Sequence, residues 1–173
     1  MRQALVTFLT LVLLWLAVAH CNHALAPLHV YLSVGGLFVT YAALALPLRT
    51  GLAAVFLGGL VCDAAIPVPF GLHALLFAAA HYALFRVRDR VPRDDTVARV
   101  VIALLTNLAL FLVFAFLEAS RLPDPAAVWP RVGCDLICSQ VFLTLIAPWF
   151  FALQERALEL ARVSPAATNR VYG

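Results

Sequence analysis

One carboxylate, Asp63, stands inside a long apolar stretch of the sequence, where an ionised side chain is costly. Such a group is a candidate for function by default, for example in binding an ion or relaying a proton. A proton relay needs a second titratable group, and the sequence places no other acid and no lysine beside Asp63. The competing interpretation is structural, with the carboxylate accepting hydrogen bonds from free N–H groups at the start of the next helix. The residues favour the structural role and leave the functional one open.

Histidine and cysteine, the usual ligands of transition metals, crowd the end of the first apolar run. The four residues are His20, Cys21, His23 and His29. Their spacing matches no familiar metal site, and we expect neither a metal nor another cofactor.

Two further histidines, His73 and His81, share one face of a predicted helix with Phe77. Packing or hydrogen bonding explains that face better than catalysis. Cys134 and Cys138 lie one helical turn apart and are interpreted as small packing residues, with an oxidised pair as the alternative in an oxidising compartment. No nucleophile elbow, zinc-protease motif or phosphate loop occurs, so the sequence gives no sign of an enzyme.

The elements that must position these residues are apolar helices in a membrane. Hydrophobic residues make up 64% of the chain and charged residues 12%, against about 25% charged in soluble proteins. The apolar runs are Leu5–Ala19, Leu28–Leu46, Leu52–Ile66, Phe70–Phe85, Val100–Leu117 and Leu136–Leu153. A full span needs about 20 residues, which the second, fifth and sixth runs supply and the third and fourth do not. We predict an all-α integral membrane protein with six transmembrane helices.

Arginine fixes the predicted orientation. All 12 basic residues are Arg. With six spans and cytoplasmic N and C termini, the inner side holds Arg2, Arg49, Arg86, Arg88, Arg90, Arg93, Arg99, Arg156, Arg162 and Arg170. Only Arg121 and Arg131 then lie outside, as the positive-inside rule demands. No basic run carries interleaved aromatics, so we expect no nucleic acid partner.

The chain is predicted to form one domain, residues 1–163, followed by a cytoplasmic tail, residues 164–173. The first run could be a cleaved signal peptide, because Ala17-Val18-Ala19 resembles a cleavage site. We expect it to be retained, since further apolar spans follow at once.

Small residues predict a tight hairpin between the third and fourth helices. Two rows repeat every four residues on adjacent strips of the third helix: Ala54, Gly58 and Cys62, and Gly51, Val55, Gly59 and Asp63. Small side chains let membrane helices approach closely. The two runs rise only roughly 22 and 24 Å at 1.5 Å per residue, which is less than the hydrocarbon thickness of about 30 Å. The turn at residues 66–69 is therefore expected below the outer headgroups.

The stretch from Tyr41 to Phe85 resembles the rod-shape-determining membrane protein family MreD. It contains Leu44-Ala45-Leu46-Pro47 followed by Arg49, then Gly59 before Asp63, and Gly71 eight residues after that carboxylate. A weaker similarity to the family is found at Trp129 and at Pro148-Trp149-Phe150-Phe151. Family members often place small turn-forming residues between the Asp and the Gly, and this chain has Ala64-Ala65-Ile66-Pro67-Val68-Pro69-Phe70 instead.

The resemblance implies a non-enzymatic scaffold of the bacterial cell-elongation complex in the inner membrane. The implied partners are the periplasmic scaffold MreC, the actin-like filament protein MreB, a membrane glycosyltransferase and a penicillin-binding transpeptidase that build lateral-wall peptidoglycan. The cytoplasmic basic loop with Arg86, Arg88, Arg90 and Arg93 would face acidic lipid or the filament. The alternative is a small-molecule-binding membrane subunit of a transporter, with Asp63, His73 and Asp135 lining a pocket open to the outside.

Overall fold

The computed structural model describes residues 2–65, 69–90, 95–122 and 126–161. This part of the chain is helical and contains no β-strand. The helices are α1 (Arg2–Leu25), α2 (Gly35–Ala45), α3 (Leu48–Ala65), α4 (Leu72–Val87), α5 (Thr96–Ala119) and α6 (Trp129–Leu160), with short 3-10 turns at Ala26–Leu28, Arg88–Arg90 and Ala126–Val128.

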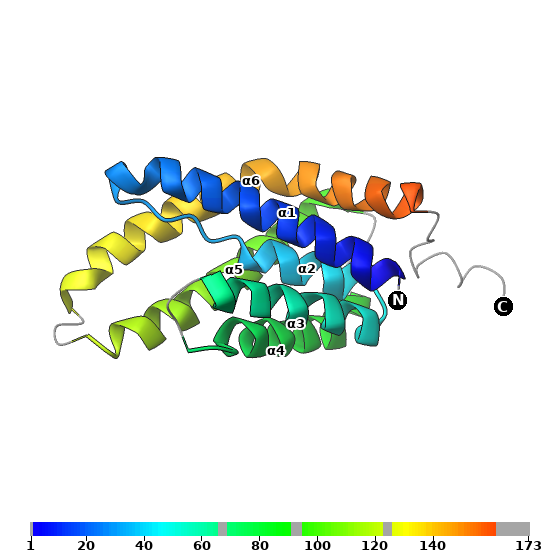
Figure 1. Ribbon diagram of the computed structural model, residues 1–173, viewed down its shortest axis with the longest axis horizontal. Helices are drawn as coiled ribbons and strands as arrows, with labels where there is room; N and C mark the ends of the chain where they lie inside the picture. Colours follow the sequence, from blue (N-terminus) through cyan, green and yellow to red (C-terminus); the bar gives the residue numbers. More distant parts are fainter. Residues whose placement is uncertain (1, 66–68, 91–94, 123–125, 162–173) are drawn as a thin grey trace.

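Successive helices run in opposite directions along one long axis (Figure 1). The start of α1 and the end of α6 therefore lie at the same end of the bundle, together with the start of α3 and the end of α4. We call this end, which carries Arg49, Arg86 and Arg88, the arginine end, and the other the cavity end. Arg121 and Arg131 lie at the cavity end.

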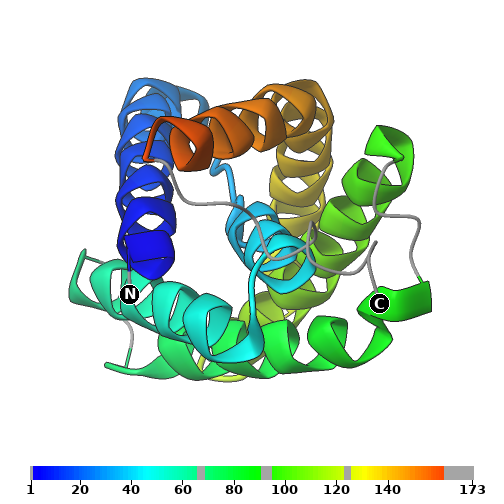
Figure 2. The same cartoon turned by 90° about the vertical axis from the view of Figure 1, so that its right-hand side faces the viewer.

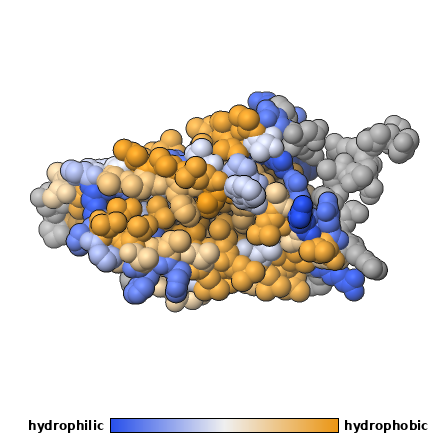
Figure 3. Space-filling view, turned by 90° about the horizontal axis from the view of Figure 1, so that it is seen from above, coloured by the Kyte–Doolittle hydropathy of each residue, from blue (hydrophilic) through white to orange (hydrophobic). Residues whose placement is uncertain are grey.

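Within the described residues, four helical stretches are long and apolar enough to cross a membrane: Arg2–Leu28, Leu48–Ala65, Thr96–Ala119 and Ala126–Leu160. The surface agrees, because apolar side chains cover the middle of the molecule and hydrophilic ones gather toward both ends (Figure 3). The described residues thus confirm the coarse prediction of an all-helical protein with helices able to span a membrane.

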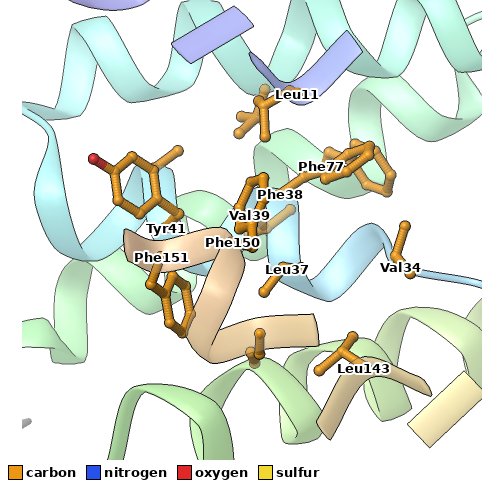
Figure 4. Close-up of a cluster of buried hydrophobic side chains, with 14 of the residues drawn as sticks. Leu11, Val34, Leu37, Phe38, Val39, Tyr41, Phe77, Leu143, Phe150 and Phe151 are labelled. Carbon is orange, nitrogen blue, oxygen red and sulfur yellow. The ribbon is translucent and has the colours of Figure 1, made fainter. Parts of the chain in front are cut away.

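Helix α2 lies inside a ring formed by the other five helices (Figure 2). Every residue from Gly36 to Leu44 is buried, as expected of a helix that is apolar on all sides. Leu37, Phe38, Val39 and Tyr41 of α2 pack with Leu11 of α1, Phe77 of α4 and Leu143, Phe150 and Phe151 of α6 (Figure 4).

The prediction of a continuous second helix over Leu28–Leu46 is wrong. The helix begins only at Gly35, and residues 30–34 are non-helical. Hydropathy cannot separate a buried extended segment from a buried helix, because both are apolar throughout.

The α3–α4 hairpin ends short of the neighbouring helices at the cavity end (Figure 1). Helix α3 has 18 residues and α4 has 16, against 24 in α5. The predicted turn falls largely outside the described residues, at 66–68. Helix α5 begins with Asp95 as its cap, whose carboxylate accepts a hydrogen bond from Val97 N at 2.9 Å.

Helix α6 has 32 residues, which corresponds to roughly 48 Å at 1.5 Å per residue. It therefore extends beyond a hydrocarbon core of about 30 Å. Residues 162–173, which include the predicted tail, lie outside the described residues.

Candidate functional site

Asp63, on the last turn of α3, caps the first turn of α4. Its Oδ2 accepts hydrogen bonds from the backbone N–H of Gly71 at 3.1 Å and of Ala74 at 3.2 Å. Its Oδ1 accepts from the backbone N–H of His73 at 2.9 Å and lies 2.8 Å from His73 Nδ1. The side chain is fully buried. The carboxylate thus satisfies three N–H groups that a helix start leaves without partners, which confirms the predicted hydrogen bonding.

Two glycines permit this cap. Gly71 precedes α4 with φ 95°, a left-handed conformation that suits glycine. Gly59 lies where a Cβ would be 2.5 Å from Ala74 Cα and 2.6 Å from Ala74 N. The backbones of α3 and α4 therefore meet at Gly59, and the predicted tight hairpin is present.

Gly58 does not take part in that contact. A Cβ there would meet nothing within 4 Å. Of the two small-residue rows, the one with Gly51, Gly59 and Asp63 faces α4, since a Cβ at Gly51 would lie 2.5 Å from His81 Cε1. His81 itself is fully buried.

The non-helical segment before α2 is held by side chains of other helices. Asn22 of α1 binds both backbone groups of Leu32, accepting from its N–H at 2.8 Å and donating to its carbonyl at 3.0 Å. Asp135 of α6 accepts from Tyr31 N at 2.9 Å, and Ser139 Oγ accepts from Ser33 N at 3.0 Å. Non-helical backbone at this depth is tolerated only where protein or water satisfies it, and here side chains do so.

Asn107 of α5 completes the arrangement by accepting from Gly36 N at 3.1 Å. A Cβ at Gly36 would collide with the backbone of Asn107, so the first turn of α2 contacts α5 directly. The sequence interpretation overlooked Asn22, Asn107 and Ser139. The available signal was an isolated Asn or Ser inside an otherwise apolar helix, which needs a buried partner.

Asp135, which the transporter alternative places in a pocket wall, is buried, with 9% of its surface exposed. Glu118 is exposed and pairs with Arg121 at 3.7 Å.

A cavity of about 690 Å³ lies between the non-helical segment and the α3–α4 hairpin. The non-helical segment contributes Tyr31, Leu32, Ser33 and Val34. The facing helices contribute aromatic and polar groups, among them Trp15, Phe38, His73, Phe77, Phe111, Phe114, Glu118, Arg131 and Asp135. The volume and the mainly apolar lining are those of a small-molecule site.

His73 connects the cap to the cavity. Its ring stacks on Phe114 with centroids 4.2 Å apart and meets the edge of Phe77 at 5.8 Å. His73 and Asp135 line the cavity, as the transporter alternative expects. Asp63 is not among the lining residues, and its carboxylate lies behind His73.

The arginines at the other end differ in environment. Arg88 Nη1 donates to the carbonyl of Leu46 at 3.1 Å, and its guanidinium lies 3.7 Å from the centroid of Phe85. Arg86 contacts Tyr82, while Arg90 is exposed. Arg93 lies outside the described residues.

The corner between α2 and α3 is built at Pro47. Helix α2 ends at Ala45, Leu46 is extended, and the Pro47 carbonyl accepts from Gly51 N at 2.9 Å in the first turn of α3. Arg49 is exposed in that turn, as predicted for a residue at a membrane surface.

The histidine, cysteine and acidic side chains of the described residues do not form a metal-binding cluster. Among the described residues, no group of three His, Cys, Asp or Glu side chains is placed to hold a metal ion. Cys21, Cys62, Cys134 and Cys138 are all free thiols.

The described residues form a helical protein with helices long and apolar enough to cross a membrane, a capped short hairpin and a cavity at one end. Comparison of the chain with models of known families, with curated proteins and with solved structures gave no match. The function is therefore inferred from the residues and their geometry.

Proposed function

We propose that the chain is a multi-pass scaffold of the bacterial inner membrane, similar to MreD, that holds partner proteins of the cell-elongation machinery. In this role it helps to maintain rod shape during lateral-wall peptidoglycan synthesis and carries out no catalysis itself. The proposed partners are an MreC-like periplasmic scaffold, an MreB-like filament, and the membrane glycosyltransferase and penicillin-binding transpeptidase of the same complex.

The observation that carries this proposal is the capping role of Asp63. The four hydrogen-bond contacts of its carboxylate are made inside the α3–α4 hairpin. These contacts give the carboxylate a structural role. The other residues that carry the resemblance build the same unit: Pro47 turns the chain into α3, Gly59 contacts Ala74 and Gly71 precedes α4. A resemblance concentrated in one rigid unit supports a common structural role.

The proposed orientation places the arginine end in the cytoplasm, with six crossings and both termini inside. Acidic lipid or the filament would then meet the exposed arginines, Arg86 and Arg90, whereas Arg88 is engaged with Leu46 and Phe85.

Partner helices in the membrane would pack on exposed apolar faces. On α1 such a face consists of Leu5, Leu9, Leu13 and Leu16, each at least half exposed.

Affinity purification of the tagged full-length chain in mild detergent, followed by mass spectrometry, tests the proposal. Wild-type protein is expected to bring down the elongation proteins, and depletion of the chain is expected to turn rods into spheres. Gly59→Leu, which would disrupt the hairpin, should lose the partners, and Gly58→Ala should keep them. Depleted cells that remain rods, with no elongation protein in the purified sample, would refute the scaffold.

The second candidate is a small-molecule-binding subunit of a transporter, and the cavity is the observation that favours it. This candidate expects loss of uptake with unchanged cell shape on depletion, and co-purification with transport proteins. The same purification therefore separates the two functions.

A further inference from the structure

The cavity is lined by aromatic rings from five parts of the chain. They come from α1, the non-helical segment, α2, α4 and α5, and are Trp15, Tyr31, Phe38, Phe77, Phe111 and Phe114. On the α4 side the rings are continuous, because Phe38 packs edge-on against Phe77 at 6.2 Å between centroids and His73 joins Phe77 to Phe114. Faces of aromatic rings attract cations through their quadrupole.

Asp135 is a buried acid without a cationic partner among the described residues. One carboxylate oxygen accepts from Tyr31 N, and no ion pair to a described Arg or His is formed. An uncompensated carboxylate in an apolar wall is destabilising, and a cation beside it would remove that cost. Asp135 therefore marks a place where positive charge is favoured.

His73 adds a second hydrogen-bond acceptor. Since a carboxylate only accepts hydrogen bonds, the 2.8 Å contact between Asp63 Oδ1 and His73 Nδ1 requires the proton on Nδ1. When the ring carries only that proton, Nε2 is an acceptor. The remaining basic side chain on the wall, Arg131, is exposed and belongs to the rim.

We propose that the cavity binds an organic monocation, a protonated amine or quaternary ammonium on a compact apolar or aromatic body. The cation lies against the aromatic wall, and its charge is compensated by Asp135. This inference supplies a ligand class to the transporter-subunit candidate, and it is independent of the scaffold proposal.

Trp15 provides a reporter inside the cavity. The other two tryptophans, Trp129 and Trp149, do not line it and are exposed. Trp129→Phe combined with Trp149→Phe therefore leaves fluorescence from Trp15 alone. The full-length protein in detergent is titrated with phenethylamine, with its neutral analogue 2-phenylethanol and with the anion 3-phenylpropionate.

The expected result is a saturable change in Trp15 fluorescence with phenethylamine, at least tenfold tighter than with the alcohol, and no saturation with the anion. Equal responses to amine and alcohol would mean apolar partition only and would overturn the proposal. Absence of a saturable response to the amine would overturn it as well.

Asp135→Asn isolates the charge, because the amide oxygen still accepts from Tyr31 N. Its affinity for phenethylamine should fall at least tenfold. Glu155→Gln, at the arginine end and outside the cavity, is the matched control and should bind as wild type does. Unchanged affinity in Asp135→Asn would overturn the role of Asp135.

Ala115→Phe keeps the test decisive if Asp135→Asn does not fold. Ala115 lines the cavity, and a ring there should occupy the space and abolish saturation while thermal unfolding stays cooperative. A folded Ala115→Phe that binds as well as wild type would contradict the assignment of this cavity. None of these readouts involves cell shape or co-purified partners, so their failure leaves the scaffold proposal standing.

Discussion

Asp63 accepts a 3.2 Å hydrogen bond from the backbone N–H of Ala74. Gly59 brings the α3 backbone into contact with the same alanine. One side-chain acceptor and one missing side chain therefore fix the start of α4 against the end of α3. A membrane-embedded carboxylate can be explained by this geometry without any chemistry on a substrate.

Replacing Asp63 should destabilise the fold. In Asp63→Asn, one of the two acceptor oxygens becomes a donor that faces backbone N–H groups, so at least one buried N–H loses its partner at a cost of about 1–3 kcal/mol. Thermal unfolding in detergent should show a lower midpoint. Asp89→Asn, an exposed acid at the arginine end, is the control. An unchanged midpoint in Asp63→Asn would show that the cap contributes nothing.

Adjacent glycines should respond oppositely to the same change. Gly59→Ala forces a methyl group against Ala74 and should lower the unfolding midpoint clearly. Gly58→Ala meets open space and should be neutral or stabilising by up to about 1 kcal/mol, because alanine is the better helix former. The two variants are compared by thermal unfolding in one detergent. Equal midpoints would contradict the contact between the α3 and α4 backbones.

Asn22→Ala should loosen the non-helical segment. The substitution leaves both the N–H and the carbonyl of Leu32 without their present partner, at about 1–3 kcal/mol for each buried group left unsatisfied. Amide hydrogen exchange at Leu32 should accelerate, while exchange in α3 stays as in wild type. Protection at Leu32 that survives the substitution would show that another group satisfies its backbone.

Cysteine accessibility should report the proposed orientation. Cys21 and Cys134 are exposed at the cavity end and Cys62 is buried. A membrane-impermeant maleimide added to cells with an opened outer barrier should label Cys21 and Cys134, and Cys62 only after unfolding. In Arg90→Cys, the added thiol at the arginine end should stay unlabelled until the inner membrane is broken. The reverse pattern would invert the proposed topology.

The sequence predicted the parts of the site that depend on neighbours along the chain. Asp63 and the N–H groups that it caps are 8 to 11 residues apart, and short runs, small residues and an acid before a helix start are visible in such a window. The role of Gly59 could be read in the same way. Gly58 could not be separated from it, because a repeat of small residues does not say which row faces the partner helix.

The non-helical segment could not be predicted, because most of the side chains that hold it are distant in the chain, Asn22 beside Leu32 being the exception. Tyr31, Ser33 and Gly36 bind acceptors on α5 and α6 that lie 71 to 106 residues later. The cavity depends on this segment. The transporter alternative placed His73 and Asp135 in a pocket wall, but the contribution of residues 31–34 to that wall was not predicted. The segment is as apolar as the helix that follows it, so its composition would suit an unbroken helix equally well.

The segment also constrains how the protein can be made. During synthesis, α1 and α2 are made before α5 and α6, so the amides of Tyr31, Ser33 and Gly36 at first lack the acceptors that they have in the folded protein. Their native hydrogen bonds can form only after Asn107, Asp135 and Ser139 have been synthesised. The packing around α2 therefore cannot be completed before α6 is made.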